Sequence, residues 1–331
     1  MAGYARRLAF DSPGALRFTA GLARGGRTLP MNRRRGFVAA LALTCTGLLL
    51  CSAPPAIAQR AEPRIGNVEY AKSADAQPLL LDLYLPSGRR PAPLLVWVHG
   101  GRWEVGSKTP MPLGLLVERG YAVASLDFQP ASMAQFPRQV HQIKAAIRFL
   151  RAMSERYGYD ASRIGILGAS SGGHLAALVG TTNGEAALEG ALGEHLDQSS
   201  AVQAIVSFFG ASNLTTILAQ STPYGVGVRT PALRQLLGKL PDESPNLARL
   251  ASPVFHVDAA DPPLLLLHGD QDPQMPINQS HELVGAYENV GLKASFVVVH
   301  GAGHGGPRFY DREHLTLVAE FLDAHLLRVG S

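Results

Sequence analysis

Residues 163–179 read RIGILGASSGGHLAALV, and this stretch carries the clearest indication of the fold. The apolar run that ends at Leu167 predicts a buried strand, and the run that begins at His174 predicts a helix. Between the two lies the pattern Gly-x-Ser-x-Gly, centred on Ser170. We therefore expect a strand, a sharp turn and a helix, with the Ser170 hydroxyl exposed at the turn.

Ser170, rather than its neighbour Ser171, fits the centre of this turn. Side chains two residues before and two residues after the serine would collide in so sharp a turn, and Gly168 and Gly172 stand there. Centring the pattern on Ser171 would put Ala169 at the first small position. The sequence therefore predicts Ser170 as a nucleophile, with the backbone N–H of Ser171 beside it.

Short apolar runs alternate with helical patterns along most of the chain. Unbroken apolar runs are typical of strands buried on both faces. The alternation predicts an α/β fold with a doubly wound, mainly parallel sheet and functional loops at the carboxyl ends of the strands. The predicted strands are Leu79–Leu85, Leu94–Val98, Tyr121–Phe128, Ile164–Leu167, Val202–Phe209, Leu264–Leu267 and Ser295–Val299, and the predicted helices include residues 136–157, 280–288 and 312–327.

Two stretches interrupt this alternation. Residues 181–200 are rich in Gly, Ala and Glu, and residues 211–253 are rich in Pro and Leu. Long irregular insertions of this kind are often functional, so both could form a small cap over the site.

Residues 1–58 differ from the rest and are predicted to be a leader. From Met31, an arginine cluster precedes an apolar run of about 16 residues and the segment Ala56-Ile57-Ala58, which is the order of a secretory signal peptide. We expect translation from Met31, cleavage after Ala58 and a periplasmic or secreted protein, exported by the Sec or the twin-arginine route. The run is shorter than the roughly 20 residues that span a membrane, so no stable membrane anchor is expected.

The leader also accounts for the basic charge of the chain. It holds eight of the 30 basic and one of the 26 acidic residues, which leaves 22 basic and 25 acidic residues and a net charge of −3. Nucleic acid is therefore not an expected partner. Both cysteines, Cys45 and Cys51, lie in the leader, so residues 59–331 are expected to form a single domain stabilised by its core.

A serine hydroxyl needs a general base, and histidine is the best suited because its pKa lies near neutral pH. Two candidates, His300 and His304, lie in the glycine-rich segment after the last predicted strand. His300 directly ends the apolar run and is expected to point into the sheet. His304 stands in a flexible glycine loop and is the favoured base.

The base needs a carboxylate to hold its far nitrogen. Asp270 and Asp272 both follow the strand over residues 264–267, and residue type alone does not choose between them. Either assignment gives the chain order serine, acid, histidine. A site for the negative oxygen of the intermediate follows an early strand, in His99-Gly100-Gly101-Arg102-Trp103, and we nominate the N–H groups of Gly101, Arg102 and Ser171.

These motifs together resemble the α/β-hydrolase superfamily, and specifically the bacterial feruloyl and xylan esterase-like (BD-FAE-like) branch, related to hormone-sensitive-lipase-type esterases and kynurenine formamidases. The resemblance covers residues 65–327. It implies that Asp272 is the acid, that His304 is the base, and that Gly101 and Arg102 donate to the oxyanion. The chain departs from many relatives at Arg102, where they have Gly, and at Phe128-Gln129, where they have Tyr-Arg.

The predicted function is a secreted serine esterase that forms an acyl-enzyme on Ser170, acting on a small or polymer-linked ester. No cofactor and no metal are expected, since His268, His300 and His304 lack a tight ligand pattern. The alternatives are an amidase, formamidase or peptidase with the same residues, and a binding protein that retains the hydrolase scaffold without catalysis.

Overall fold

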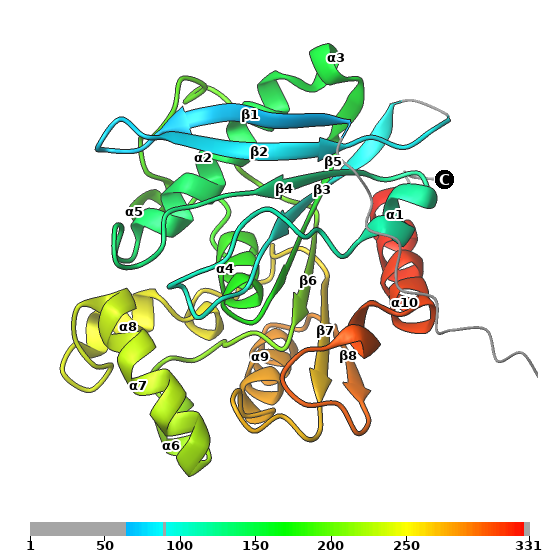
Figure 1. Ribbon diagram of the computed structural model, residues 1–331. Coiled ribbons are helices and arrows are strands. Elements are labelled where there is room, and N and C mark those ends of the chain that lie inside the picture. The colour runs from blue at the N-terminus through cyan, green and yellow to red at the C-terminus, as the bar shows by residue number, and fades with distance from the viewer. Residues whose placement is uncertain (1–63, 89–90, 328–331) are drawn as a thin grey trace, which may run out of the picture. The chain divides into compact units, whose positions relative to one another are not determined.

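The computed structural model describes residues 64–88 and 91–327 (Figure 1). The leader predicted over residues 1–58, with its cleavage point after Ala58, lies outside the described residues. No helix within the described ranges is long and apolar enough to cross a membrane.

An eight-stranded sheet forms the centre of the domain, in the order β1-β2-β4-β3-β5-β6-β7-β8 (Figure 1). Strand β2 runs antiparallel to both of its neighbours, β1 and β4, and all other pairs are parallel. This confirms the predicted doubly wound, mainly parallel α/β sheet. The strands are β1 Ile65–Lys72, β2 Pro78–Tyr84, β3 Ala92–Val98, β4 Ala122–Leu126, β5 Tyr159–Ala169, β6 Ala204–Phe208, β7 Leu264–Gly269 and β8 Ala294–Val299.

The central strands alternate their side chains between two layers of helices, as the two-residue period of a strand requires. In β3, the side chains of Leu94, Val96 and Val98 pack against α2, α4 and α9. Those of Leu95 and Trp97 lie on the other face and pack against α1 and α10. Both faces are thus buried, which explains the unbroken apolar runs. The helices of the two layers are α1 Gly114–Glu118, α2 Arg138–Ala152, α4 Ser171–Gly180, α9 Asn278–Asn289 and α10 Arg312–Leu322.

Two elements differ from the sequence-based expectation. Strand β1 was not predicted, because it is an edge strand with mostly exposed or half-buried residues and carries little apolar signal. The helix expected over residues 136–157 divides at Met153 into α2 and a short α3, Ser154–Tyr157, which ends at Gly158 with a left-handed φ of 77°.

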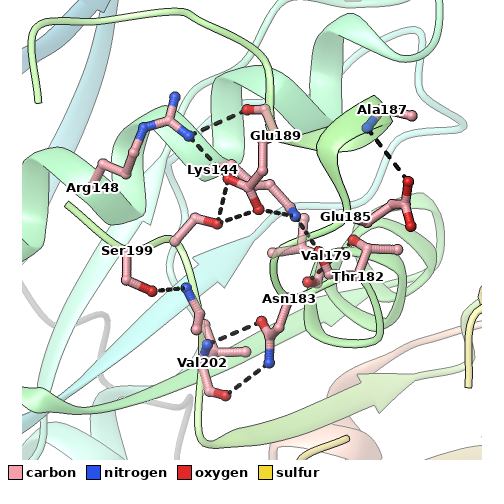
Figure 2. A network of polar contacts seen from close by, with 12 residues as sticks. Lys144, Arg148, Val179, Thr182, Asn183, Glu185, Ala187, Glu189, Ser199 and Val202 are labelled. Atoms are coloured by element: carbon pink, nitrogen blue, oxygen red, sulfur yellow. Dashed lines mark hydrogen bonds and ion pairs between the residues drawn. The ribbon is translucent and has the colours of Figure 1, made fainter. Parts of the chain in front are cut away.

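The first predicted cap segment does not cover the site. Residues 181–200, which contain the short α5 Ala186–Glu189, are held against α2 by a buried ionic network (Figure 2). Lys144 Nζ lies 2.6 Å from Glu189 Oε1, and Arg148 Nη1 lies 3.2 Å from Glu189 Oε2. The cap expectation is wrong for this segment, because Lys144 and Arg148 of α2 bind Glu189 and hold the segment against that helix.

The second segment, which we call the cap, packs on the loop after β7. It contains α6 Ile217–Gln220, α7 Pro223–Leu237 and α8 Pro245–Leu250. The start of α7 rests on the loop after β7, where Thr222 Oγ1 donates to the Pro273 carbonyl at 2.8 Å. Gly225 lies so close to that loop that a Cβ would stand 3.0 Å from the Gln274 carbonyl. Cap and loop are therefore in direct contact.

Replacing Glu189 with Gln should destabilise the fold, because Lys144 and Arg148 would keep buried charges without their counterion. Removing one partner of a buried pair costs about 3 kcal/mol or more. Urea denaturation measures the change, with Glu194→Gln as control, since Glu194 is exposed in the same segment. Equal stability of the two variants would contradict the role assigned to this network.

Candidate active site

The turn at Ser170 is built by backbone contact. Ser170 follows β5 directly and has φ 54° and ψ −118°, a conformation that a residue with a side chain adopts only under strain. A Cβ on Gly168 would lie 2.2 Å from the Gly172 carbonyl, and one on Gly172 would lie 2.1 Å from the Val98 carbonyl. Both glycines are thus required by close packing of the turn on itself and on the end of β3.

The hydroxyl of Ser170 contacts one of the two candidate histidines. Ser170 Oγ lies 2.8 Å from His304 Nε2. Ser171 begins α4, and its hydroxyl is buried without a hydrogen-bond partner among the described residues. The structure therefore places Ser170, and not Ser171, on the predicted base.

His304 in turn contacts one of the two candidate acids. Its Nδ1 lies 2.7 Å from Asp272 Oδ2, so Nδ1 carries the proton and Nε2 is free to accept one from Ser170. Burial lowers the pKa of His304 below its ordinary value, and the hydrogen bond with Asp272 opposes this without cancelling it. The imidazole is therefore neutral at neutral pH, which is the state a general base needs.

Asp272 is held ionised by four donors. Its Oδ1 accepts from the N–H groups of Gln274 and Met275, each at 2.8 Å, and its Oδ2 lies 3.3 Å from His268 Nε2. Burial alone would raise the pKa of Asp272, but the hydrogen bonds from His268 and His304 outweigh it and hold that pKa far below its ordinary value. The contact with His268 was not predicted. His268 lies near the end of β7, four residues before Asp272, and this spacing was a usable signal.

The other candidate pair forms a separate contact on the surface. His300 Nδ1 lies 2.9 Å from Asp270 Oδ2, and the Gly301 N–H donates to Asp270 Oδ1 at 2.7 Å. His300 does not point into the sheet as expected, since its side chain is 83% exposed. The reason is that β8 ends at Val299, so His300 already belongs to the loop, and its pair with Asp270 joins the loops after β7 and β8.

The three nominated oxyanion donors lie around Ser170. Gly101 and Arg102, in the loop after β3, have φ values of 130° and 58°. A Cβ on Gly101 would lie 2.0 Å from the Val105 carbonyl, so this turn requires glycine. Within the described residues, the N–H groups of Gly101, Arg102 and Ser171 donate to no other group. They are available to an oxygen bound next to Ser170.

A buried hydrogen-bond relay joins this loop to α4 and to the cap. Trp103 Nε1 donates to His174 Nδ1 at 3.1 Å, and His174 Nε2 lies 2.6 Å from the carbonyl of Ala251, which follows α8. Burial lowers the pKa of His174 to about 4, so the ring stays neutral and can accept at one nitrogen while donating at the other. Phe128, a departure from many relatives, stacks on His99 at 4.4 Å and supports the same loop.

A pocket of about 260 Å³ opens beside Ser170. It is lined by Gly101 and Arg102 of the loop after β3. Three further side chains that line it were not predicted from the sequence: Val105, Phe209 and Gln274. Phe209 follows β6 directly and packs edge-on against His304 at 5.0 Å, so its place at the carboxyl end of a strand was a usable signal. Arg102 lines the pocket mouth and pairs with Glu104 at 3.0 Å.

Across residues 64–88 and 91–327, no group of three or more His, Cys, Asp or Glu side chains could hold a metal ion. The groups that meet at the described site are a hydroxyl, an imidazole, a carboxylate and backbone N–H donors.

Proteins similar to this chain carry esterase names. Esterase LipC from Mycobacterium tuberculosis is 32% identical over 220 residues, which are 65% of this chain and 53% of LipC. Isoprenylcysteine alpha-carbonyl methylesterase ICME from Arabidopsis thaliana is 32% identical over 278 residues, which are 80% of this chain and 62% of that protein. The chain thus spans little more than half the length of these relatives.

Solved structures give the same picture. A truncated carbohydrate esterase from gut microbiota superposes with a TM-score of 0.73 at 33% identity, covering 83% of this chain and 99% of the other. The BD-FAE family profile matches residues 81–287, a range that includes Ser170 and Asp272. By this match, the chain belongs to the BD-FAE family.

Proposed function

We propose that this protein is a carboxylic-ester hydrolase with Ser170 as nucleophile, His304 as general base and acid, and Asp272 as the residue that orients His304. The observation that carries the proposal is the unbroken path of short contacts from Ser170 Oγ through His304 to Asp272, at 2.8 and 2.7 Å. The esterase names of the relatives favour an ester over an amide as substrate.

In the first half of the reaction, Ser170 Oγ forms a bond to the ester carbonyl carbon while its proton passes to His304 Nε2. The carbonyl oxygen becomes negative and accepts hydrogen bonds from the N–H groups of Gly101, Arg102 and Ser171. Each such donor contributes about 2.7–4 kcal/mol to the transition state. The C–O bond to the alcohol then breaks, and His304 returns the proton to the leaving alcohol oxygen.

In the second half, water attacks the acyl-enzyme and gives its proton to His304. The bond between the acyl carbon and Ser170 Oγ breaks, Ser170 regains a proton, and the carboxylic acid leaves. Asp272 stays ionised throughout and stabilises the imidazolium form of His304. Arg102 contributes through its backbone, so its side chain does not prevent this role.

Ser170→Ala should abolish ester hydrolysis, with kcat reduced by at least about 10⁴-fold, because the nucleophile is lost. A fluorophosphonate probe should label the wild-type enzyme at Ser170, as located by mass spectrometry. Thermogutta terrifontis esterase 2, 26% identical with a TM-score of 0.67 over 79% of this chain and 95% of that chain, has been solved phosphonylated by sarin, which supports this choice of probe.

Ser171→Ala is the matched control, because it keeps the backbone N–H and removes a hydroxyl that has no hydrogen-bond partner among the described residues. This variant should still be labelled and active. Folded wild-type protein that takes up no label would favour a non-catalytic binding protein. Turnover of N-formylkynurenine in preference to 4-nitrophenyl esters and methyl ferulate would favour the amidase alternative.

Asp272→Asn should lower kcat by about 10⁴-fold, since an amide favours the wrong tautomer of His304. Asp270→Asn should retain most of the activity, because Asp270 contacts the surface residue His300. Steady-state kinetics on one neutral ester compare the two variants. A greater loss in Asp270→Asn would show that the acid has been assigned to the wrong aspartate.

The activity should persist to lower pH than an ordinary histidine would allow. His304 acts as a base in its neutral form, and its pKa lies below the ordinary 6.5. As the pH falls, kcat/KM should therefore decline with an apparent pKa below 6.5. A pH profile with a neutral ester measures this, and an acid limb above 6.5 would contradict the description of the site.

A further inference from the structure

A buried arginine in the cap lacks an anionic partner. Arg229, in α7, is fully buried, and its Nε lies 3.4 Å from the Gln274 carbonyl. Its Nη1 and Nη2 have no hydrogen-bond partner among the described residues. Burial lowers the pKa of Arg229 to about 10, so the group still carries its charge at neutral pH. Burying an unpaired cation is strongly unfavourable, so the two Nη groups of Arg229 are expected to bind an anion.

The carboxylates around the pocket are already engaged. Asp272 accepts from two backbone N–H groups and from His304, and Glu104 pairs with Arg102. Neither is within ion-pair distance of Arg229, since Arg229 forms no salt bridge with any described residue. An anion that pairs with Arg229 would therefore come from outside the described part of the chain.

Arg229 lies next to the pocket that contains Ser170. Its Nε donates to the carbonyl of Gln274, and Gln274 lines that pocket. Its charge also acts on Asp272, Arg102 and His304. The guanidinium is therefore close to the reacting groups, behind the Gln274 side of the pocket.

The first turns of α7, which carry Arg229, have features that weaken a helix locally. The start of α7 contains two glycines, and Pro231 has no N–H to donate to the Gly227 carbonyl, so one helical hydrogen bond is missing. Tyr224 and Val226 in the same turns are 60% and 38% exposed. Arg229 does not itself line the pocket, so a ligand that reaches it has to displace the half-buried Gln274 side chain.

We infer that Arg229 is a specificity residue whose two free Nη groups bind a carboxylate of the substrate, so that the preferred ester carries an acidic group close to the scissile bond. The two parallel N–H donors of a guanidinium match the two oxygens of a carboxylate. The acidic group belongs to the acyl part or to the alcohol part of the ester. This inference rests on the proposed ester hydrolysis.

Two substrate pairs test the inference, and the members of each pair share the scissile ester and differ in one carboxylate. Mono-4-nitrophenyl glutarate and 4-nitrophenyl pentanoate test the acyl part, and 3-acetoxybenzoate and phenyl acetate test the alcohol part. In at least one pair, Arg229→Met should lower the ratio of kcat/KM for the charged ester to that for the neutral ester by about 10- to 100-fold. The pair that responds identifies the part of the ester that carries the acid.

Arg234→Met is the matched control, because Arg234 is on the same helix but its side chain is exposed. Its Nη2 forms a long surface ion pair of 3.8 Å with Glu243 Oε1. Its ratio should equal that of the wild type. Unchanged ratios in both pairs for Arg229→Met would overturn the inference. If the wild-type enzyme hydrolyses none of the four esters, the proposed function is rejected instead.

Inhibition of the wild-type enzyme provides a measurement that does not depend on how the variants fold. Glutarate should inhibit more strongly than pentanoate, or 3-hydroxybenzoate more strongly than phenol, in the same pair that responds to Arg229→Met. Equal inhibition within both pairs would also overturn the inference.

Discussion

The contact between the backbone at Gly172 and the end of β3 sets the geometry of the whole site. A Cβ at this position would lie 2.1 Å from the Val98 carbonyl and 2.4 Å from that of His99. This approach puts the strained Ser170 directly beside the loop that follows β3. Ser170 and the N–H groups of Gly101 and Arg102 are thus positioned by close backbone packing.

The electrostatics of the site follow from burial. Asp272 remains ionised because two histidines and two backbone N–H groups surround it, and its charge in turn fixes the tautomer of His304. Three of these donors come from β7 and the loop that follows it, so the acid is held by its own segment. The fourth, His304, comes from the loop after β8, and the pair of Asp270 and His300 joins those two loops.

The cap is part of the same structure. It rests on the loop after β7 through Thr222 and Gly225, and it receives the end of the relay from Trp103 through His174. Changes in the cap therefore reach both the loop after β7 and the loop after β3. The first insertion is instead held on α2, where Glu189 pairs with Lys144 and Arg148.

The sequence by itself determined what depends on local sterics and periodicity. Apolar runs indicated seven of the strands because those strands are buried, and the spacing of Gly168 and Gly172 indicated the turn at Ser170 because so sharp a turn leaves no room for side chains there. The edge strand β1 escaped detection because its mostly exposed or half-buried residues carry little apolar signal. The spacing along the chain favoured His304 and left Asp270 and Asp272 open, and only the family resemblance pointed to Asp272. The tertiary structure decided which pair meets Ser170. Two Asp-His pairs form, at 2.9 and 2.7 Å, and only that of Asp272 and His304 reaches Ser170. That meeting, like the burial of Arg229, depends on which loops lie together in space, which spacing along the chain does not encode.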